Sequence, residues 1–134
     1  MKQPSIVLRT LLSAAVILIV ALTGVASAHH ATSSYDKEQL VSVSGTVLRW
    51  QFINPHSGLW LEVAGEDGET TEWSGEFQGT LDLYRHFSFN KNTFAPGDQI
   101  NLTGYPDRMG NPTMSVRFVG FSDGREVDVR SAPD

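Results

Sequence analysis

The chain has 134 residues, no cysteine, and 15 acidic against 10 basic side chains, which gives a formal net charge of −5 at pH 7. This length accommodates one domain with a single modest core, and the absence of cysteine excludes disulfides and thiolate metal sites. An acidic protein is poorly suited to attracting nucleic acid or anionic lipid over long range, so we expect neither as a partner.

The first 28 residues have the pattern of a cleavable signal peptide. Lys2 and Arg9 provide a basic start, residues 11–25 are almost continuously apolar, and Ala26 and Ala28 place small residues at the −3 and −1 positions of a cleavage site. The pattern predicts a periplasmic or secreted protein with no membrane span after cleavage. A cut after Ala26 instead of Ala28, or an uncleaved signal anchor, is the alternative.

Residues 40–50 alternate between apolar and polar side chains, a period of two that predicts a β-strand. Val41, Val43 and Val47 would share one face of this strand. Gly45 in its middle indicates a bulge or a sharp bend.

A second strand is predicted at residues 59–64. One face of it would hold Leu59, Leu61 and Val63, and the other Trp60 and Glu62. Residues 65–68 form a hairpin-turn signal, with Asp67-Gly68 its strongest part, and residues 70–74 are expected to pair back across the turn.

Residues 80–87 are the one stretch that predicts a helix. Thr80 is a suitable capping residue, and Leu81, Tyr84 and Phe87 would form the apolar side of the helix.

Two more strands are predicted at residues 99–105 and 113–121, before Asp123-Gly124 turns the chain into a short extended tail. The inward side chains would be Ile100 and Leu102 in the first strand, and Met114, Val116 and Phe118 in the second.

Three strands, a short helix and two strands follow one another in the order of an OB-type barrel. We therefore expect a mainly β fold: a small OB-like five-stranded barrel with one short helix between strands 3 and 4. The barrel would span residues 40–130, after a polar arm at 29–39 and before a tail at 131–134. A small open β-sandwich is the alternative.

Several short motifs occur in a fixed order along the chain. They are Ala28-His29-His30 with Tyr35-Asp36, Gly45-Thr46-Val47, Asn54-Pro55-His56, Trp73 with Glu76, Pro96-Gly97-Asp98, Leu102-Thr103-Gly104 and Asp123-Gly124-Arg125. In this combination the chain resembles the DUF6152 family of small exported bacterial proteins, over essentially everything after the leader. The resemblance implies export and a small β fold, but no mechanism, because the family has no established activity. Phe52 and Ala31 depart from the family's usual Trp and Ser, and residues 83–94 match poorly.

Three histidines of these motifs, His29, His30 and His56, are the candidate metal ligands. Cleavage after Ala28 frees the amine of His29, which can chelate an ion together with its own imidazole, while His30 or His56 adds a further nitrogen. Such all-nitrogen sets favour Cu(II), with Ni(II) and Zn(II) behind it. Cleavage after Ala26 leaves Ser27-Ala28-His29, which forms a square-planar site for Cu(II) or Ni(II). In the alternative interpretation these histidines are passive.

A second group of candidate ligand-binding residues lies in and near the second and third predicted strands: Arg49, Trp60, Glu62 and Trp73. OB barrels bind oligomers on the outer face of these strands, with aromatic side chains as stacking platforms. A peptide, a glycan, another small ligand or an envelope protein would suit such a face. Alternatively, Trp60 or Trp73 closes one end of the barrel.

The sequence contains no nucleophile elbow, zinc-protease motif or phosphate-binding glycine loop, so we do not expect an enzyme. It favours an exported binding module that holds copper or another divalent ion through the histidine cluster. A structural or interaction protein of the cell envelope with passive histidines is the alternative. A copper-dependent redox enzyme that uses the terminal histidines is a third hypothesis.

Overall fold

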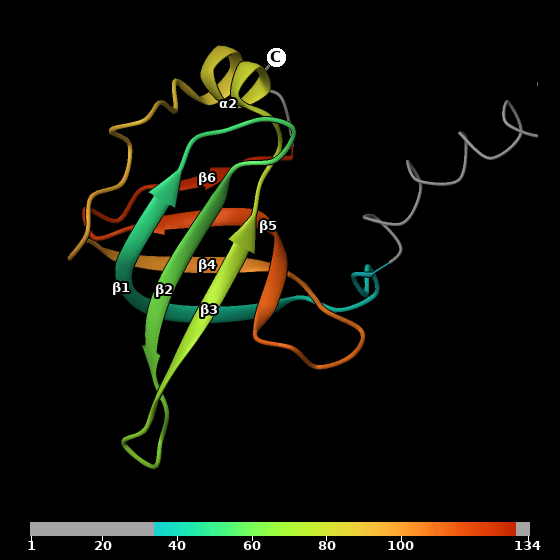
Figure 1. The fold of residues 1–134 in the computed structure, drawn as a ribbon, viewed down its shortest axis with the longest axis vertical. Helices are drawn as coiled ribbons and strands as arrows, with labels where there is room; N and C mark the ends of the chain where they lie inside the picture. The colour runs from blue at the N-terminus through green and yellow to red at the C-terminus, as the bar shows by residue number, and fades with distance from the viewer. Residues whose placement is uncertain (1–33, 131–134) are drawn as a thin grey trace, which may run out of the picture. The chain divides into compact units, whose positions relative to one another are not determined.

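The computed structural model describes residues 34–130, so the predicted signal peptide, His29, His30 and the tail at 131–134 lie outside the described residues. The elements of the described part follow one another as β1 (Val41–Gln51), β2 (Gly58–Ala64), β3 (Thr70–Glu76), α2 (Thr80–Phe87), β4 (Gln99–Pro106), β5 (Thr113–Phe121) and β6 (Glu126–Asp128) (Figure 1). Within these residues no helix has the length and apolar character needed to span a membrane.

The strands close into a barrel. They pair in the order β3-β2-β1-β4-β5, and a short parallel pairing of residues 74–76 with residues 113–115 joins β3 back to β5. β6 pairs antiparallel with β5 and extends the sheet beyond the barrel. The closure confirms the OB-like five-stranded barrel with its helix between the third and fourth strands, and the open-sandwich alternative is wrong.

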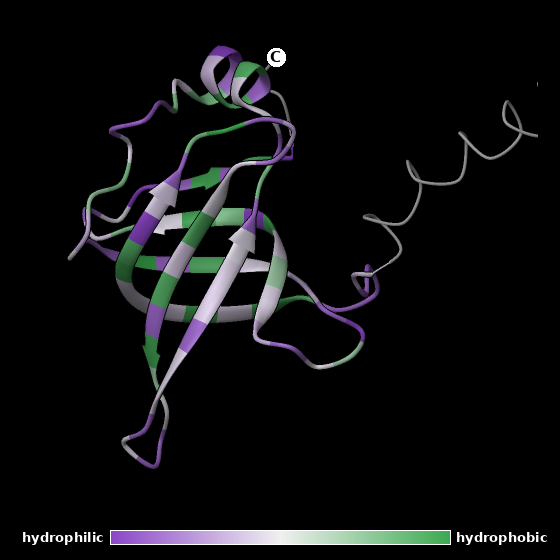
Figure 2. Cartoon of the chain, in the orientation of Figure 1, coloured by the Kyte–Doolittle hydropathy of each residue, from purple (hydrophilic) through white to green (hydrophobic). Residues whose placement is uncertain are grey.

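Alternate residues of the strands fill the interior of the barrel. Leu59 and Leu61 of β2, Leu102 of β4 and Val116 of β5 are fully buried, because every second side chain of a strand points to the same face. Figure 2 shows this alternation as apolar and polar bands along β2. Aromatic rings pack against one another at the edge of this aliphatic core: Trp50, Phe52, Phe77, Phe89, Phe94 and Phe121.

β1 is strongly curved (Figure 1) because its first half pairs with β4 and its second half with β2. The register irregularity lies further along than predicted, between Val47 and Arg49, while Gly45 pairs regularly with β4. Glycine is required at position 45 because a Cβ there would lie 2.5 Å from the carbonyl oxygen of Glu62.

α2 lies across one end of the barrel (Figure 1) and has the predicted bounds. Its predicted apolar side is wrong in part, because Leu83 is buried whereas Leu81 and Tyr84 are 56% and 62% exposed. A helix of two turns has one narrow face toward the core, and Leu83 and Phe87, four positions apart, form it.

The prediction that the side chain of Thr80 caps this helix is wrong, because the N-cap residue is Gly79, which has no side chain to form a capping hydrogen bond. Oδ1 of Asn54 instead accepts hydrogen bonds from the backbone N–H of Thr80 at 2.9 Å and from its hydroxyl at 3.0 Å. Asn54 precedes a cis peptide bond to Pro55. The loop between β1 and β2, which carries His56, is thereby tied to the start of α2.

β5 carries one extra residue, Arg117, where its register against β4 shifts. Met114 and Val116 are fully buried before the extra residue, as predicted, and Val119 is fully buried after it. Phe118 therefore lies on the opposite face from Val119, and the prediction that it shares a face with Val116 is wrong.

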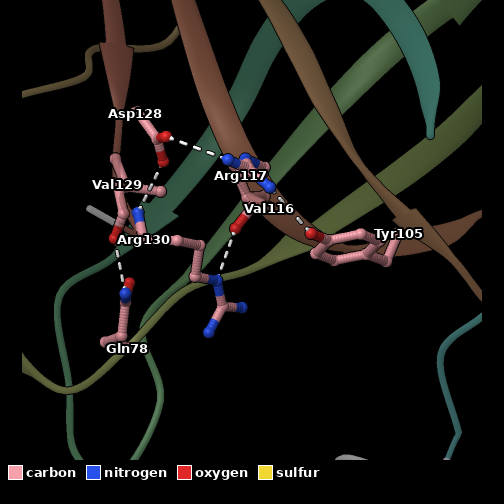
Figure 3. A network of polar contacts seen from close by, with 7 residues as sticks. All are labelled: Gln78, Tyr105, Val116, Arg117, Asp128, Val129 and Arg130. Atoms are coloured by element: carbon pink, nitrogen blue, oxygen red, sulfur yellow. Dashed lines mark hydrogen bonds and ion pairs between the residues drawn. The ribbon is translucent and has the colours of Figure 1, made fainter. Parts of the chain in front are cut away.

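Polar contacts hold the segment after β5 against the barrel (Figure 3). This segment, predicted to be merely extended after Asp123-Gly124, contains the sixth strand β6. Arg117 donates a hydrogen bond to the hydroxyl of Tyr105 at 3.1 Å and forms an ion pair with Asp128 at 3.4 Å. Gln78 and Arg130 complete the network through bonds to backbone carbonyl groups.

Candidate functional site

A pocket of about 280 Å³ opens on the outside of the barrel, beside the pairing that joins β3 to β5. The arm before β1, the loop between β1 and β2, and strands β2, β3 and β5 all contribute to it. Its polar and aromatic lining includes Tyr35, His56, Trp60, Ser74, Glu76 and Thr113. A larger hollow of about 350 Å³ on β1, β4 and β5 contains none of the site residues predicted from the sequence.

One carboxylate joins two of the motif residues in this pocket. Oε1 of Glu76 lies 3.0 Å from Nδ1 of His56, and the hydroxyl of Tyr35 donates a hydrogen bond to Oε2 of Glu76 at 3.2 Å. The side chains of His56 and Glu76 are 45% and 34% exposed. The three side chains come from positions far apart in the chain and form a continuous chain of polar contacts at the protein surface.

The backbone around Ser57 places His56 beside Glu76. Ser57 is buried, and both of its backbone polar groups bond to the residues that follow β3. Its N–H donates to the carbonyl of Gln78 at 3.1 Å, and its carbonyl accepts from the N–H of Phe77 at 2.9 Å. These bonds continue the β2–β3 ladder into the loop. They leave His56 next to the end of β3, where Glu76 is the last residue.

The arm before β1 is docked on the barrel at Tyr35, which is 9% exposed and bridges to Asp107. Two backbone hydrogen bonds secure it, from Asp36 to the carbonyl of Pro106 at 2.8 Å and from Arg108 to the carbonyl of Ser34 at 2.9 Å. The arm therefore enters the described structure at the pocket.

Burial raises the pKa of the Tyr35 phenol above its ordinary value of 10.0, the hydrogen bond with Thr113 opposes this rise, and the charge of Glu76 adds to it. A raised pKa means that the folded state holds the phenol proton more tightly than the unfolded state. The resulting stabilisation is fully present below pH 10.0 and is lost as the pH rises through the raised pKa.

We therefore expect the free energy of unfolding to fall more steeply above pH 10.0 in the wild type than in Tyr35→Phe. Urea titrations at a series of alkaline pH values measure this difference. Tyr84→Phe is the matched control, because Tyr84 is 62% exposed and its removal should leave the wild-type steepness unchanged. Parallel curves for the wild type and Tyr35→Phe would contradict the prediction.

Arg130 adds a positive charge near Glu76. Its guanidinium donates to the carbonyl of Val116 at 2.9 Å and to the hydroxyl of Ser115, the residue in register with Glu76 (Figure 3 shows the first of these bonds). Burial lowers the pKa of Arg130, and the negative charge of Glu76 is the largest influence against that lowering. Glu76 thus has a histidine, a phenol and a guanidinium as neighbours.

A sequence model of a family of unknown function, DUF6152, matches residues 15–116. The chain belongs to the DUF6152 family. A search of curated proteins found no match. The matched range includes Tyr35, His56 and Glu76, whereas Arg130 lies beyond its end.

In this DUF6152 protein the predicted ligand-binding side chains are divided between the two sides of the sheet. Arg49, Trp60 and Glu62 lie on the outer face, and the guanidinium of Arg49 sits 4.0 Å from the centre of the Trp60 ring. Arg49 also forms an ion pair with Glu72 at 3.5 Å. Because Arg49 covers one face of Trp60, this tryptophan serves as a wall of the pocket more readily than as an open stacking platform.

Trp73 lies apart from the other members of that group. It is in register with Leu61, which is fully buried, and it packs against the hydrophobic core. Trp73 therefore lies on the inner side of the sheet, opposite to Trp60 and Glu62.

Of the three candidate metal ligands, His56 alone lies within residues 34–130. In that range no three His, Asp or Glu side chains gather in an arrangement that could hold a metal ion. His29 and His30 precede the described part, six and five positions before Tyr35 in the sequence.

Sequence reasoning did not include Tyr35 or Glu76 among the site residues of the DUF6152 protein. Both belong to the motifs on which the family resemblance rests, and that shared membership was the available signal. The contact between them could not be predicted from the sequence, because they are 41 positions apart.

Proposed function

We propose that this protein is an exported, non-enzymatic binding module that holds Cu(II) or another divalent ion through His56 and the histidines at the start of its mature chain. The observation that carries the proposal is the carboxylate of Glu76, which contacts both His56 and the docked arm residue Tyr35. His56 and Tyr35 thus contact the same carboxylate, and the proposal adds His29 and His30, which precede Tyr35 in the sequence.

The length of the arm supports this proposal. His30 precedes Tyr35 by five positions, and five extended residues span at most about 17 Å. Tyr35 is itself linked to His56 through a single carboxylate. We propose that imidazoles from the arm and from the loop coordinate one ion within this span.

The predicted cleavage supports it as well. A cut after Ala28 makes His29 the first residue, so that an amine and an imidazole are available for chelation at once. Nitrogen ligands of this kind suit Cu(II), Ni(II) and Zn(II), of which Cu(II) binds most tightly in general. The periplasmic or secreted location follows from the same leader sequence.

Mass spectrometry of the exported protein identifies its first residue. A start at His29 or at Ser27 agrees with the proposal, and a start well before Ser27 contradicts it because both chelating arrangements are then lost. The same sample is used for the metal titrations.

Competition titration with Cu(II) tests the folded site. We expect His56→Ala to weaken Cu(II) binding by roughly tenfold or more, the scale seen when the surroundings of a metal ligand are altered. His86→Ala is the matched control, because His86 is an exposed histidine on α2 and should leave the affinity unchanged. Equal affinities of the wild type and His56→Ala would instead favour the alternative, a structural or interaction protein whose histidines are passive.

A further inference from the structure

We propose that the outer edge of the β2–β3 hairpin, at residues 70–73 of β3, accepts an extended basic segment of a partner protein as an additional β-strand. None of these four residues lines the pocket described above. The edge is therefore separate from the proposed metal site.

The first half of β3 has a strand on one side only. β3 pairs with β2 over its whole length, residues 70–76, but with β5 over residues 74–76 alone. Within the described part of the chain, residues 70–73 thus form an open edge. Figure 1 shows this part of the hairpin projecting beyond the barrel. A strand added here would lie in line with β5, which occupies the same edge further along.

The backbone at this edge is oriented for pairing. The N–H of Ser74 donates to the carbonyl of Pro112 at 3.0 Å and so points away from β2. Backbone groups of every second residue in a ladder point to the same side, so those of Glu72 and Thr70 also point outward. Lysine, proline and bulges commonly block such edges. Residues 70–73 include neither lysine nor proline, and their register with β2 is regular.

The charge of the hairpin favours a basic occupant. Residues 58–76 contain no lysine, arginine or histidine, and their acidic side chains are Glu62, Glu66, Asp67, Glu69, Glu72 and Glu76. Glu72 lies directly opposite Glu62 in the register of β2 and β3, and like charges in this arrangement destabilise a sheet. Arg49 of β1 contacts Glu72 at 3.5 Å, but both side chains remain about half exposed. A lysine or arginine of an added strand would offset the repulsion further.

The same charges disfavour a second copy of this chain on the edge. Pairing two such edges would bring two acidic hairpins side by side, which is unfavourable. A peptide that adds a strand to a sheet gains affinity from backbone hydrogen bonds and specificity from its side chains at alternate positions. An extended basic segment meets both conditions at β3.

Amide hydrogen exchange of the exported protein, followed by NMR, tests the edge directly. The probe is an eight-residue peptide of alternating lysine and threonine, at an ionic strength of about 0.01 M, where screening is weak. In the free protein we expect faster exchange at Glu72 than at Trp73, whose N–H faces β2, and we expect the peptide to protect Glu72. Protection of Glu72 before peptide is added overturns the proposal in favour of a second copy. Peptide binding that leaves the exchange of Glu72 unchanged also overturns it.

Two further peptides separate strand addition from simple charge attraction. The first has glutamate in place of lysine, and we expect no binding. The second is the lysine–threonine peptide methylated at every backbone nitrogen, which keeps the charge and the side chains but removes the N–H donors. We expect it to bind about tenfold more weakly or less, because several hydrogen bonds are lost. Equal affinity of the methylated and unmethylated peptides contradicts strand addition.

Variants of the chain complete the test. We expect Glu72→Gln to weaken binding of the lysine–threonine peptide by about two- to fivefold, the range for an exposed ion pair. Glu126→Gln is the matched control, because it removes an exposed acid of β6, outside the hairpin, and should leave the affinity unchanged.

Thr70→Pro removes one outward N–H and keeps every charge. Proline is tolerated at the first residue of a strand, which Thr70 is in β3, and backbone amide spectra establish that each variant is folded. We expect binding about two- to tenfold weaker than in the wild type. An unchanged affinity in Thr70→Pro, or equal affinities of Glu72→Gln and Glu126→Gln, overturns the proposal.

Discussion

Replacing Phe77 by alanine is expected to lower the free energy of unfolding by about 3–5 kcal/mol, the range for removing a buried phenylalanine ring. Phe77 is 1% exposed and meets Trp50 edge-on with ring centres 5.4 Å apart, and its ring lies 6.4 Å from that of Phe94. Deleting the ring removes both aromatic contacts and leaves a cavity. The closed barrel prevents the surrounding side chains from moving in to fill it. Urea denaturation followed by tryptophan fluorescence measures the change.

The size of this effect is large relative to the total stability of a small domain, which is typically about 5–15 kcal/mol. Leu81→Ala provides the control, because Leu81 is 56% exposed on α2 and its truncation should change the stability by no more than about 0.5 kcal/mol. Similar losses in Phe77→Ala and Leu81→Ala would contradict the assignment of Phe77 to the core.

Gly104→Ala is expected to destabilise the protein by about 3 kcal/mol, the upper part of the usual range for overpacking. A Cβ at this position would overlap the carbonyl oxygen of Ser115 and lie 3.0 Å from the Cα of Val116. Both obstacles are backbone atoms at the register shift between β4 and β5, so relief requires the two strands to separate. Thermal denaturation of the variant and the wild type measures the loss.

Gly120→Ala is the matched control for this prediction, since Gly120 lies on the same pair of strands. The nearest atom to an added Cβ there is the Cβ of Asn101 at 3.3 Å, so the neighbour needs to shift by only a few tenths of an ångström. We expect a change below about 1 kcal/mol. If Gly104→Ala were as stable as Gly120→Ala, the close approach of β4 and β5 would be ruled out.

The order of the elements was predictable because it depends on local patterns. Each element shows a periodic pattern of apolar side chains among residues that are close in sequence. This holds for the strands at residues 40–50 and 59–64 and for the short helix at residues 80–87. The misplaced details have a common cause in tertiary contacts. Phe118 lies on the other face of β5 from the predicted one because one extra residue in β5 shifts its pairing with β4. Leu83, and not the predicted Leu81, is in the core because the barrel end determines which face of α2 is covered.

The candidate site was predictable only in part. His56 and Trp60 were identified as residues whose chemistry suits ligand binding, and both line one pocket. Their partners were not identified, since Glu76 was expected to lie beyond the end of its strand. β3 in fact continues to Glu76, and this extension brings the carboxylate to His56.

The periodicities of the chain were sufficient to predict a β-barrel with one short helix, because hydrophobic alternation is a property of short segments. The contact of Tyr35, Glu76 and His56 was decided by the closure of β3 on β5 and by the docking of the arm, which are long-range events. Each of these side chains is unremarkable in its own segment. The carboxylate of Glu76 contacts a phenol and an imidazole because the folded backbone holds one against each of its two oxygens.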